Sequence, residues 1–180
     1  MRIIGFDPGI AIGKPVAIVA IDDAYHPGCP MPGDDPTPWV QLLGHAPKDK
    51  LDGMHWRRTT YIRSVLRAEI DRWAPDLIAV EDSYTRNFRN KQGERTFPLH
   101  AIVQYVMDWC TEWSVSCVTV NPQTVKAAFG KKKPEIAKNI RLLVRSANKL
   151  PRGYDWTDAC AVALCGKAAL LLKQQREEQG

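Results

Sequence analysis

Two short apolar runs in this chain each end on an acidic residue. The run Ile3–Phe6 leads into Asp7, and the run Leu77–Val80 leads into Glu81. Short continuous apolar runs are typical of buried strands, and a buried carboxylate without a partner costs several kcal/mol. The two acids therefore constrain the chain to a fold in which the ends of buried strands form a polar site.

The rest of the chain alternates between strand-like and helix-like patterns. Strands are expected at five places, which are residues 2–7, 16–21, 40–43, 77–81 and 115–120. Helices are expected at residues 52–73, 97–113, 123–129, 134–147 and 155–175, followed by a charged tail at 176–180 that frays. The segment between the second and third strands, residues 22–38, is rich in proline and glycine and is expected to be an exposed loop. These patterns predict one α/β domain, residues 1–180, with a mixed five-stranded sheet flanked by helices.

A second pair of acids, Asp155 and Asp158, opens the last predicted helix, and their i, i+3 spacing puts both on one face. If the first and fourth strands are parallel neighbours, Asp7 and Glu81 meet at the carboxyl edge of the sheet, where sites of open α/β sheets form. Four carboxylates at that edge would suit two divalent cations acting on a phosphodiester. The alternative interpretation is that Asp155 only caps the helix.

The net charge of +5 favours polyanionic partners. The basic residues form two groups, and each group has the alternative interpretation of a solvated face. One group comprises Lys131, Lys132, Lys133, Lys138, Arg141, Arg145, Lys149 and Arg152. The other comprises Arg86, Arg89, Lys91 and Arg95.

The cysteine pattern argues against secretion and against structural zinc. The five cysteines are odd in number and include no Cys-x-x-Cys pair. Cys160 and Cys165 lie in an apolar helical run, where they are expected to pack as small hydrophobes. No signal peptide or membrane span is recognisable in the sequence, so a cytoplasmic location is expected.

Several segments in a fixed order resemble the RuvC-type Holliday junction resolvases of the ribonuclease H-like superfamily. The resemblance extends over nearly the whole chain, and its ordered set of motifs is more specific than any one of them. The matching segments are Ile4–Gly9, Ile78–Tyr84, Val120–Lys126, Ala137–Lys138 and Asp155–Ala161. The compact length and the long 22–38 segment would suit a phage-encoded member acting in an infected bacterial cell.

The resemblance implies an endonuclease that resolves four-way DNA junctions by paired symmetric nicks. It implies that Asp7, Glu81, Asp155 and Asp158 are catalytic and hold two Mg²⁺ ions, for which Mn²⁺ substitutes. It further implies a C2 homodimer. The helix at 97–113 offers Tyr105, Trp109 and Trp113 as an interface, and core packing explains these aromatics equally well.

Further residues are assigned to DNA by the same resemblance. Tyr84 falls where the family places an aromatic that stacks on a base, although a half-buried packing role is the alternative. Lys126 and Lys138 fall near the basic residues that approach the cleaved phosphate, which makes Lys138 a candidate catalytic residue. The nucleic-acid contacts are completed by Arg86, Arg89, Lys131, Lys132 and Lys133.

Three other functions remain open at this point. A ribonuclease acting on structured RNA or RNA–DNA hybrids would show the same acids. A non-catalytic junction-binding protein is disfavoured, because it would have no use for mutually repelling carboxylates. An actin-like or sugar-kinase ATPase also starts with a strand leading into an Asp-x-Gly motif, but 180 residues leave no space for its second domain.

Overall fold

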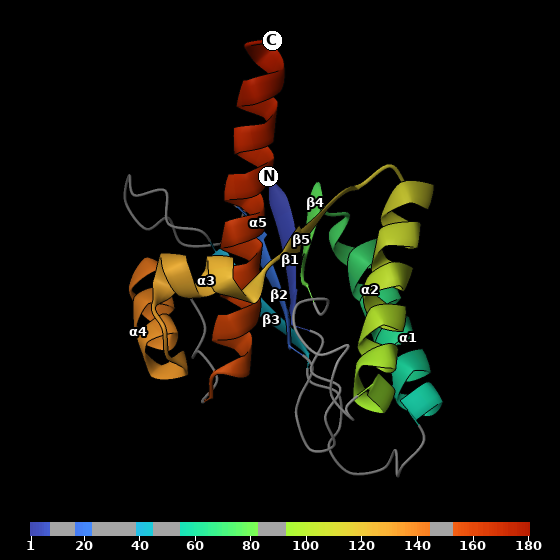
Figure 1. Ribbon diagram of the computed structural model, residues 1–180. Coiled ribbons are helices and arrows are strands. Elements are labelled where there is room, and N and C mark those ends of the chain that lie inside the picture. Colours follow the sequence, from blue (N-terminus) through green and yellow to red (C-terminus); the bar gives the residue numbers. More distant parts are fainter. Residues whose placement is uncertain (8–16, 23–38, 45–54, 83–92, 145–152) are drawn as a thin grey trace.

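The computed structural model describes residues 1–7, 17–22, 39–44, 55–82, 93–144 and 153–180. Its centre is one five-stranded sheet in the order β3-β2-β1-β4-β5 (Figure 1). The strands are β1 (Arg2–Asp7), β2 (Ala17–Asp22), β3 (Trp39–Gly44), β4 (Leu77–Glu81) and β5 (Ser116–Val120). The predicted mixed sheet is therefore confirmed.

The strand pairing brings the acidic strand ends together. β1 runs antiparallel to β2 and parallel to β4, with Ile3 opposite Leu77 and Phe6 opposite Val80. β4 in turn runs parallel to β5. Because β1 and β4 are parallel neighbours in this register, Asp7 and Glu81 leave the sheet at the same edge.

Helices cover both faces of the sheet, as Figure 1 shows: α1 and α2 lie on one side and α5 lies on the other, with α3 and α4 next to it. They are α1 (His55–Trp73), α2 (Gly93–Glu112), α3 (Pro122–Phe129), α4 (Lys133–Leu143) and α5 (Asp155–Glu178). Strand alternation assigns each residue to a face. Ile3 and Leu77 pack in the core under α5, whereas Ile4 and Ile78 pack against α1 and α2. Asp7 and Glu81 keep the parity of Ile3 and Leu77, so their side chains emerge on the α5 face.

Helix α5 lies unusually close to the sheet. A Cβ atom added to Gly5 would be 2.2 Å from the carbonyl oxygen of Ala159 and 2.6 Å from the Cβ of Ala163. Further along α5, a Cβ on Gly166 would be 2.4 Å from the Cβ of Ala79. Two glycines, one on β1 and one on α5, therefore set the separation between the helix and the strands.

The expected elements are confirmed in kind and order, and several of their ends differ from those expected. Helix α2 starts at Gly93 instead of residue 97, because its first turn carries no apolar residue that could reveal it. Helix α4 begins at Lys133 and ends at Leu143, and Val144 is already extended. Helix α5 continues to Glu178 instead of fraying from residue 176, with a Lys173–Glu177 ion pair at i, i+4 in its last turns.

Two further expectations concern the cysteines and membranes. Cys160 and Cys165 are buried in the core under α5, as predicted. The four cysteines in the described part of the chain are all free thiols. Among the described helices, none has the length and apolar character needed to span a bilayer. The proline-rich segment lies outside the described residues, apart from Asp22 at the end of β2.

Candidate metal and nucleic-acid site

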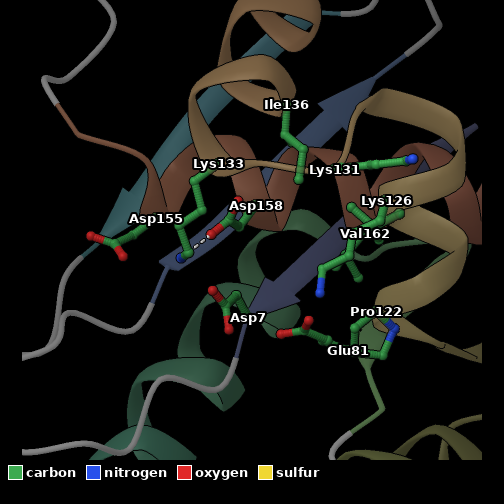
Figure 2. A pocket seen from close by; sticks show the side chains of 11 residues that line it. Asp7, Glu81, Pro122, Lys126, Lys131, Lys133, Ile136, Asp155, Asp158 and Val162 are labelled. Atoms are coloured by element: carbon green, nitrogen blue, oxygen red, sulfur yellow. Dashed lines mark hydrogen bonds and ion pairs between the residues drawn. The ribbon is translucent and has the colours of Figure 1, made fainter.

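A pocket opens at the edge of the sheet where β1 and β4 end (Figure 2). Its volume is about 340 Å³. The wall is made by strand ends and by the first turns of α3, α4 and α5. The lining residues are Asp7, Glu81, Pro122, Val125, Lys126, Lys131, Lys133, Ile136, Asp155, Asp158 and Val162. All four predicted acids and three of the predicted lysines are therefore brought into one pocket.

Asp7 and Glu81 form a hydrogen-bonded pair of carboxyl groups. Burial and the nearby carboxylates of Glu81 and Asp158 raise the pKa of Asp7 well above its usual range. Burial also raises the pKa of Glu81, against the opposing effects of the hydrogen bond from Asp7 and of nearby lysines. Two carboxylates held together in a buried site repel when both are charged, and this repulsion favours a proton shared within the pair over two ionised groups.

Asp155 and Asp158 both lie in the first turn of α5 but point differently. The cap position of this helix is Tyr154, so the interpretation of Asp155 as the capping residue is wrong. The chain reaches α5 through a turn in which the Thr157 hydroxyl donates to the Tyr154 carbonyl over 2.6 Å. Figure 2 shows Asp158 turned toward Asp7, whereas the carboxylate of Asp155 points away from both.

Lys133 supplies the positive charge closest to these acids. Its Nζ atom lies 2.5 Å from Oδ2 of Asp158. Burial works to lower the pKa of Lys133, but the hydrogen bond and the charges of Asp158, Asp7 and Asp155 raise it overall. The lysine is therefore a firmly charged counter-ion to the acidic cluster.

The pocket uses a different lysine from the one singled out as catalytic. Lys138 is exposed on α4 and is not among the lining residues. Lys133 was expected only as a nucleic-acid contact, yet it shares the inner stripe of α4 with Ile136, Ala137 and Ile140 at i+3, i+4 and i+7. That stripe was the available signal, and it was missed because the predicted helix began one residue too late.

The other residues that were predicted to contact nucleic acid lie in different places. Lys126 on α3 and Lys131 before α4 line the pocket, and Lys132 is exposed beside it. Tyr84, Arg86 and Arg89 lie outside the described residues. Four apolar or proline side chains that were not predicted complete the wall, namely Pro122, Val125, Ile136 and Val162.

The donor atoms of the pocket fit hard divalent cations in their chemistry. All the acidic donors are carboxylate oxygens, the ligands that Mg²⁺ and Mn²⁺ favour. Burial and the neighbouring acids Glu81 and Asp158 raise the pKa of Asp7, and a bound cation would offset both effects. Within the described ranges, no three acidic, histidine or cysteine side chains are close enough to share an ion as they stand. Binding of one ion by three of these acids would therefore require their side chains to rotate from these positions.

Comparisons with known proteins identify the fold. No family model and no curated sequence matches the chain. Among solved structures, Thermus thermophilus RuvC in complex with a Holliday junction substrate matches with a TM-score of 0.68 and 21% identity, over 96% of each chain. A second T. thermophilus RuvC structure matches with a TM-score of 0.67 and 20% identity, over 96% of this chain and 97% of that one.

A third solved structure, the yeast mitochondrial Holliday junction resolvase Ydc2, matches with a TM-score of 0.61 and 13% identity, over 99% of this chain and 83% of that one. The chain therefore has the ribonuclease H-like fold in the form found in RuvC-type resolvases, over nearly its full length. The expectation based on the sequence motifs is confirmed at the level of the fold.

Proposed function

We propose that this protein is a structure-selective DNA endonuclease that resolves four-way junctions by paired symmetric nicks. The observation that carries the proposal is the pocket itself, in which Asp7, Glu81 and Asp158 gather at one sheet edge and every basic side chain in the lining is a lysine. Acids suit metal ions and the surrounding lysines suit a phosphate backbone. The RuvC-type fold supports the same conclusion.

The acids are proposed to hold two Mg²⁺ ions, which Mn²⁺ can replace. Asp7 and Glu81 would provide ligands from the strand ends, and Asp155 and Asp158 would provide them from α5. Bound ions of this kind activate water and stabilise the leaving oxygen of a phosphodiester. Ionised carboxylates are the forms that bind a metal, so binding of cations by Asp7 and Glu81 should be coupled to the release of protons from the pair.

The lysines are proposed to position the DNA. Lys126, Lys131 and Lys133 surround the pocket and can neutralise the phosphate that is cut. The exposed Lys132 and Lys138 are proposed to contact the backbone further away. The roles of Tyr84 in base stacking and of Arg86 and Arg89 in backbone contact remain proposals from the sequence.

Paired nicks require two active sites, so we propose a C2 homodimer. The structure divides Tyr105, Trp109 and Trp113, of which Trp113 directly follows α2, between core and surface. Trp109 is 5% exposed and belongs to the core, whereas Trp113, stacked on it with 5.9 Å between ring centroids, is 53% exposed. Tyr105 is half-buried beneath the guanidinium of Arg63. Among the described residues, Met107 on α2 and Trp113 just after it are exposed large apolar side chains, and either is proposed to meet a second subunit.

The experiment compares cleavage of a four-way junction, a matched linear duplex and an RNA–DNA hybrid in Mg²⁺. Symmetric nicking confined to the junction is expected, and cutting of RNA alone would overturn the proposal. The Asp7→Asn variant should lose cleavage while retaining junction binding. Asp71→Asn is the matched control, because Asp71 is an exposed acid on α1 that pairs only weakly with Arg67 at 3.9 Å. Cleavage that survives Asp7→Asn would refute the site assignment.

A further inference from the structure

The contact between Lys133 and Asp158 joins two elements that are far apart in the sequence. Lys133 is the first residue of α4, Asp158 lies in the first turn of α5, and 2.5 Å separates Nζ from Oδ2. The Asp158 side chain is 15% exposed, whereas that of Lys133 is 56% exposed. Figure 2 shows the lysine reaching down to the acid beside Asp7. The Asp158 side chain is thus fixed in the wall of the pocket, while the Lys133 side chain has room to rotate toward solvent.

The other lysines of the pocket behave differently. Lys126 and Lys131 also line it, but no ion pair joins either ammonium group to a carboxylate among the described residues. Lys126 is nevertheless close enough to lower the pKa of Glu81 through its charge. Lys126 therefore contributes to the electrostatic potential of the site, and of these three lysines only Lys133 contacts a carboxylate oxygen.

An ammonium group and a metal ion compete for that oxygen. A hard divalent cation binds carboxylate oxygens at about 2.0–2.6 Å, which is the space that the Lys133 ammonium fills. A cation at Asp158 would also repel a lysine at such close range. Binding of a metal at this oxygen and retention of the ion pair therefore oppose one another.

We propose that Lys133 is an internal counter-ion that holds Asp158 in the metal-free protein and is transferred to the DNA phosphate when metal binds. This inference rests on the proposed function, because it takes Asp158 as a metal ligand and DNA as the substrate. The inference couples metal binding to DNA binding. Metal binding releases a cation toward the substrate, and a phosphate that captures Lys133 clears Asp158 for the metal, so each ligand favours the other.

Calorimetric titration of the metal-free protein with Mn²⁺ tests the first half of the proposal. Replacing Lys133 by Gln removes the competitor, so the Mn²⁺ affinity should increase about fivefold, as expected for a partly exposed ion pair. Lys126→Gln removes a charge from the same pocket without breaking an ion pair and should increase it less. Lys173→Gln is the remote control, because Lys173 pairs with Glu177 near the end of α5. The Mn²⁺ affinity of this variant should equal that of the native protein.

Chemical labelling of the native protein tests the release directly. An acylating reagent, with mass spectrometry as the readout, should modify Lys133 about fivefold faster in Mg²⁺ than in chelator, because an ion-paired ammonium reacts less readily. Labelling of Lys173 should not change. This measurement needs no variant and so does not depend on how well one folds.

The outcomes separate the two proposals. If the native protein binds no Mn²⁺ in the pocket, the proposed function fails. If it binds Mn²⁺ but Lys133→Gln binds no more tightly, or no more tightly than Lys126→Gln, the counter-ion proposal fails and the function stands. Unchanged or slower labelling of Lys133 in Mg²⁺ also overturns the transfer.

Discussion

Replacing Gly5 by Ala should separate α5 from the sheet and weaken the metal site. Gly5 lies two residues before Asp7 and on the same face of β1. The new Cβ would lie 2.2 Å from the carbonyl oxygen of Ala159, the residue after Asp158. This oxygen belongs to the helix backbone, so no side-chain rotation can relieve the contact. The helix itself must move, and Asp158 must move with it.

The size of the effect follows from the distances. A Cβ atom practically never comes within 3.0 Å of a non-bonded heavy atom, so α5 has to retreat by about 0.8 Å at Ala159 and by about 0.4 Å at Ala163, where the distance is 2.6 Å. Overpacking of this kind costs about 1–3 kcal/mol of unfolding free energy, and a rigid backbone contact should put Gly5→Ala at the upper end of that range. A displacement approaching 1 Å also exceeds the tolerance of about 0.5 Å for ligating groups.

Urea unfolding and Mn²⁺ calorimetry measure the two effects separately. Gly166→Ala is the matched control. Gly166 is also on α5, roughly 12 Å from Asp158 along the helix axis, and its new Cβ would lie 2.4 Å from the Cβ of Ala79 on β4. Both variants should be less stable than the native protein, and only Gly5→Ala should lose Mn²⁺ affinity. Native stability in Gly5→Ala, or an equal loss of affinity in the two variants, would refute the reasoning.

Three further predictions concern the acids, a cysteine and a helix cap. In chelator, the free energy of unfolding should fall as pH rises from 3.8 through the raised pKa of Asp7, because the folded state binds the Asp7 proton more tightly than the unfolded chain does. Urea unfolding curves at acidic and neutral pH should show a weaker pH dependence in Asp7→Asn. The same pH dependence in both proteins would contradict the interaction between Asp7 and Glu81. Burial raises the pKa of Cys160 to about 12, so iodoacetamide at mildly alkaline pH should label this thiol only after denaturation, as mass spectrometry can check. Asn121 caps α3 by accepting from the backbone N–H of Gln123 over 2.8 Å; Asn121→Ala should cost about 1 kcal/mol in urea unfolding and Asn121→Asp should cost less, so equal losses would deny the cap its role.

The strands and their order were accessible from local patterns. Short apolar runs such as Leu77–Val80 are typical of strands buried in a sheet, and the helical pattern between two such runs favours a parallel crossover. The meeting of Asp7 and Glu81 followed from that pairing. Helix ends were less accessible, because the first turn of α2 is polar and its residues resemble a loop.

The sequence by itself determined the kinds of elements, the strand ends that carry acids and the clustering of lysines along the chain, because these depend on neighbours in the sequence. Only the tertiary structure decided that Lys133 and not Lys138 enters the pocket, that Asp155 points away from the other acids, and that Gly5 seats α5. Each of these depends on the rotation or height of one helix over the sheet. A rotation or shift of that kind is set by packing between residues far apart in the chain, and no local pattern records it.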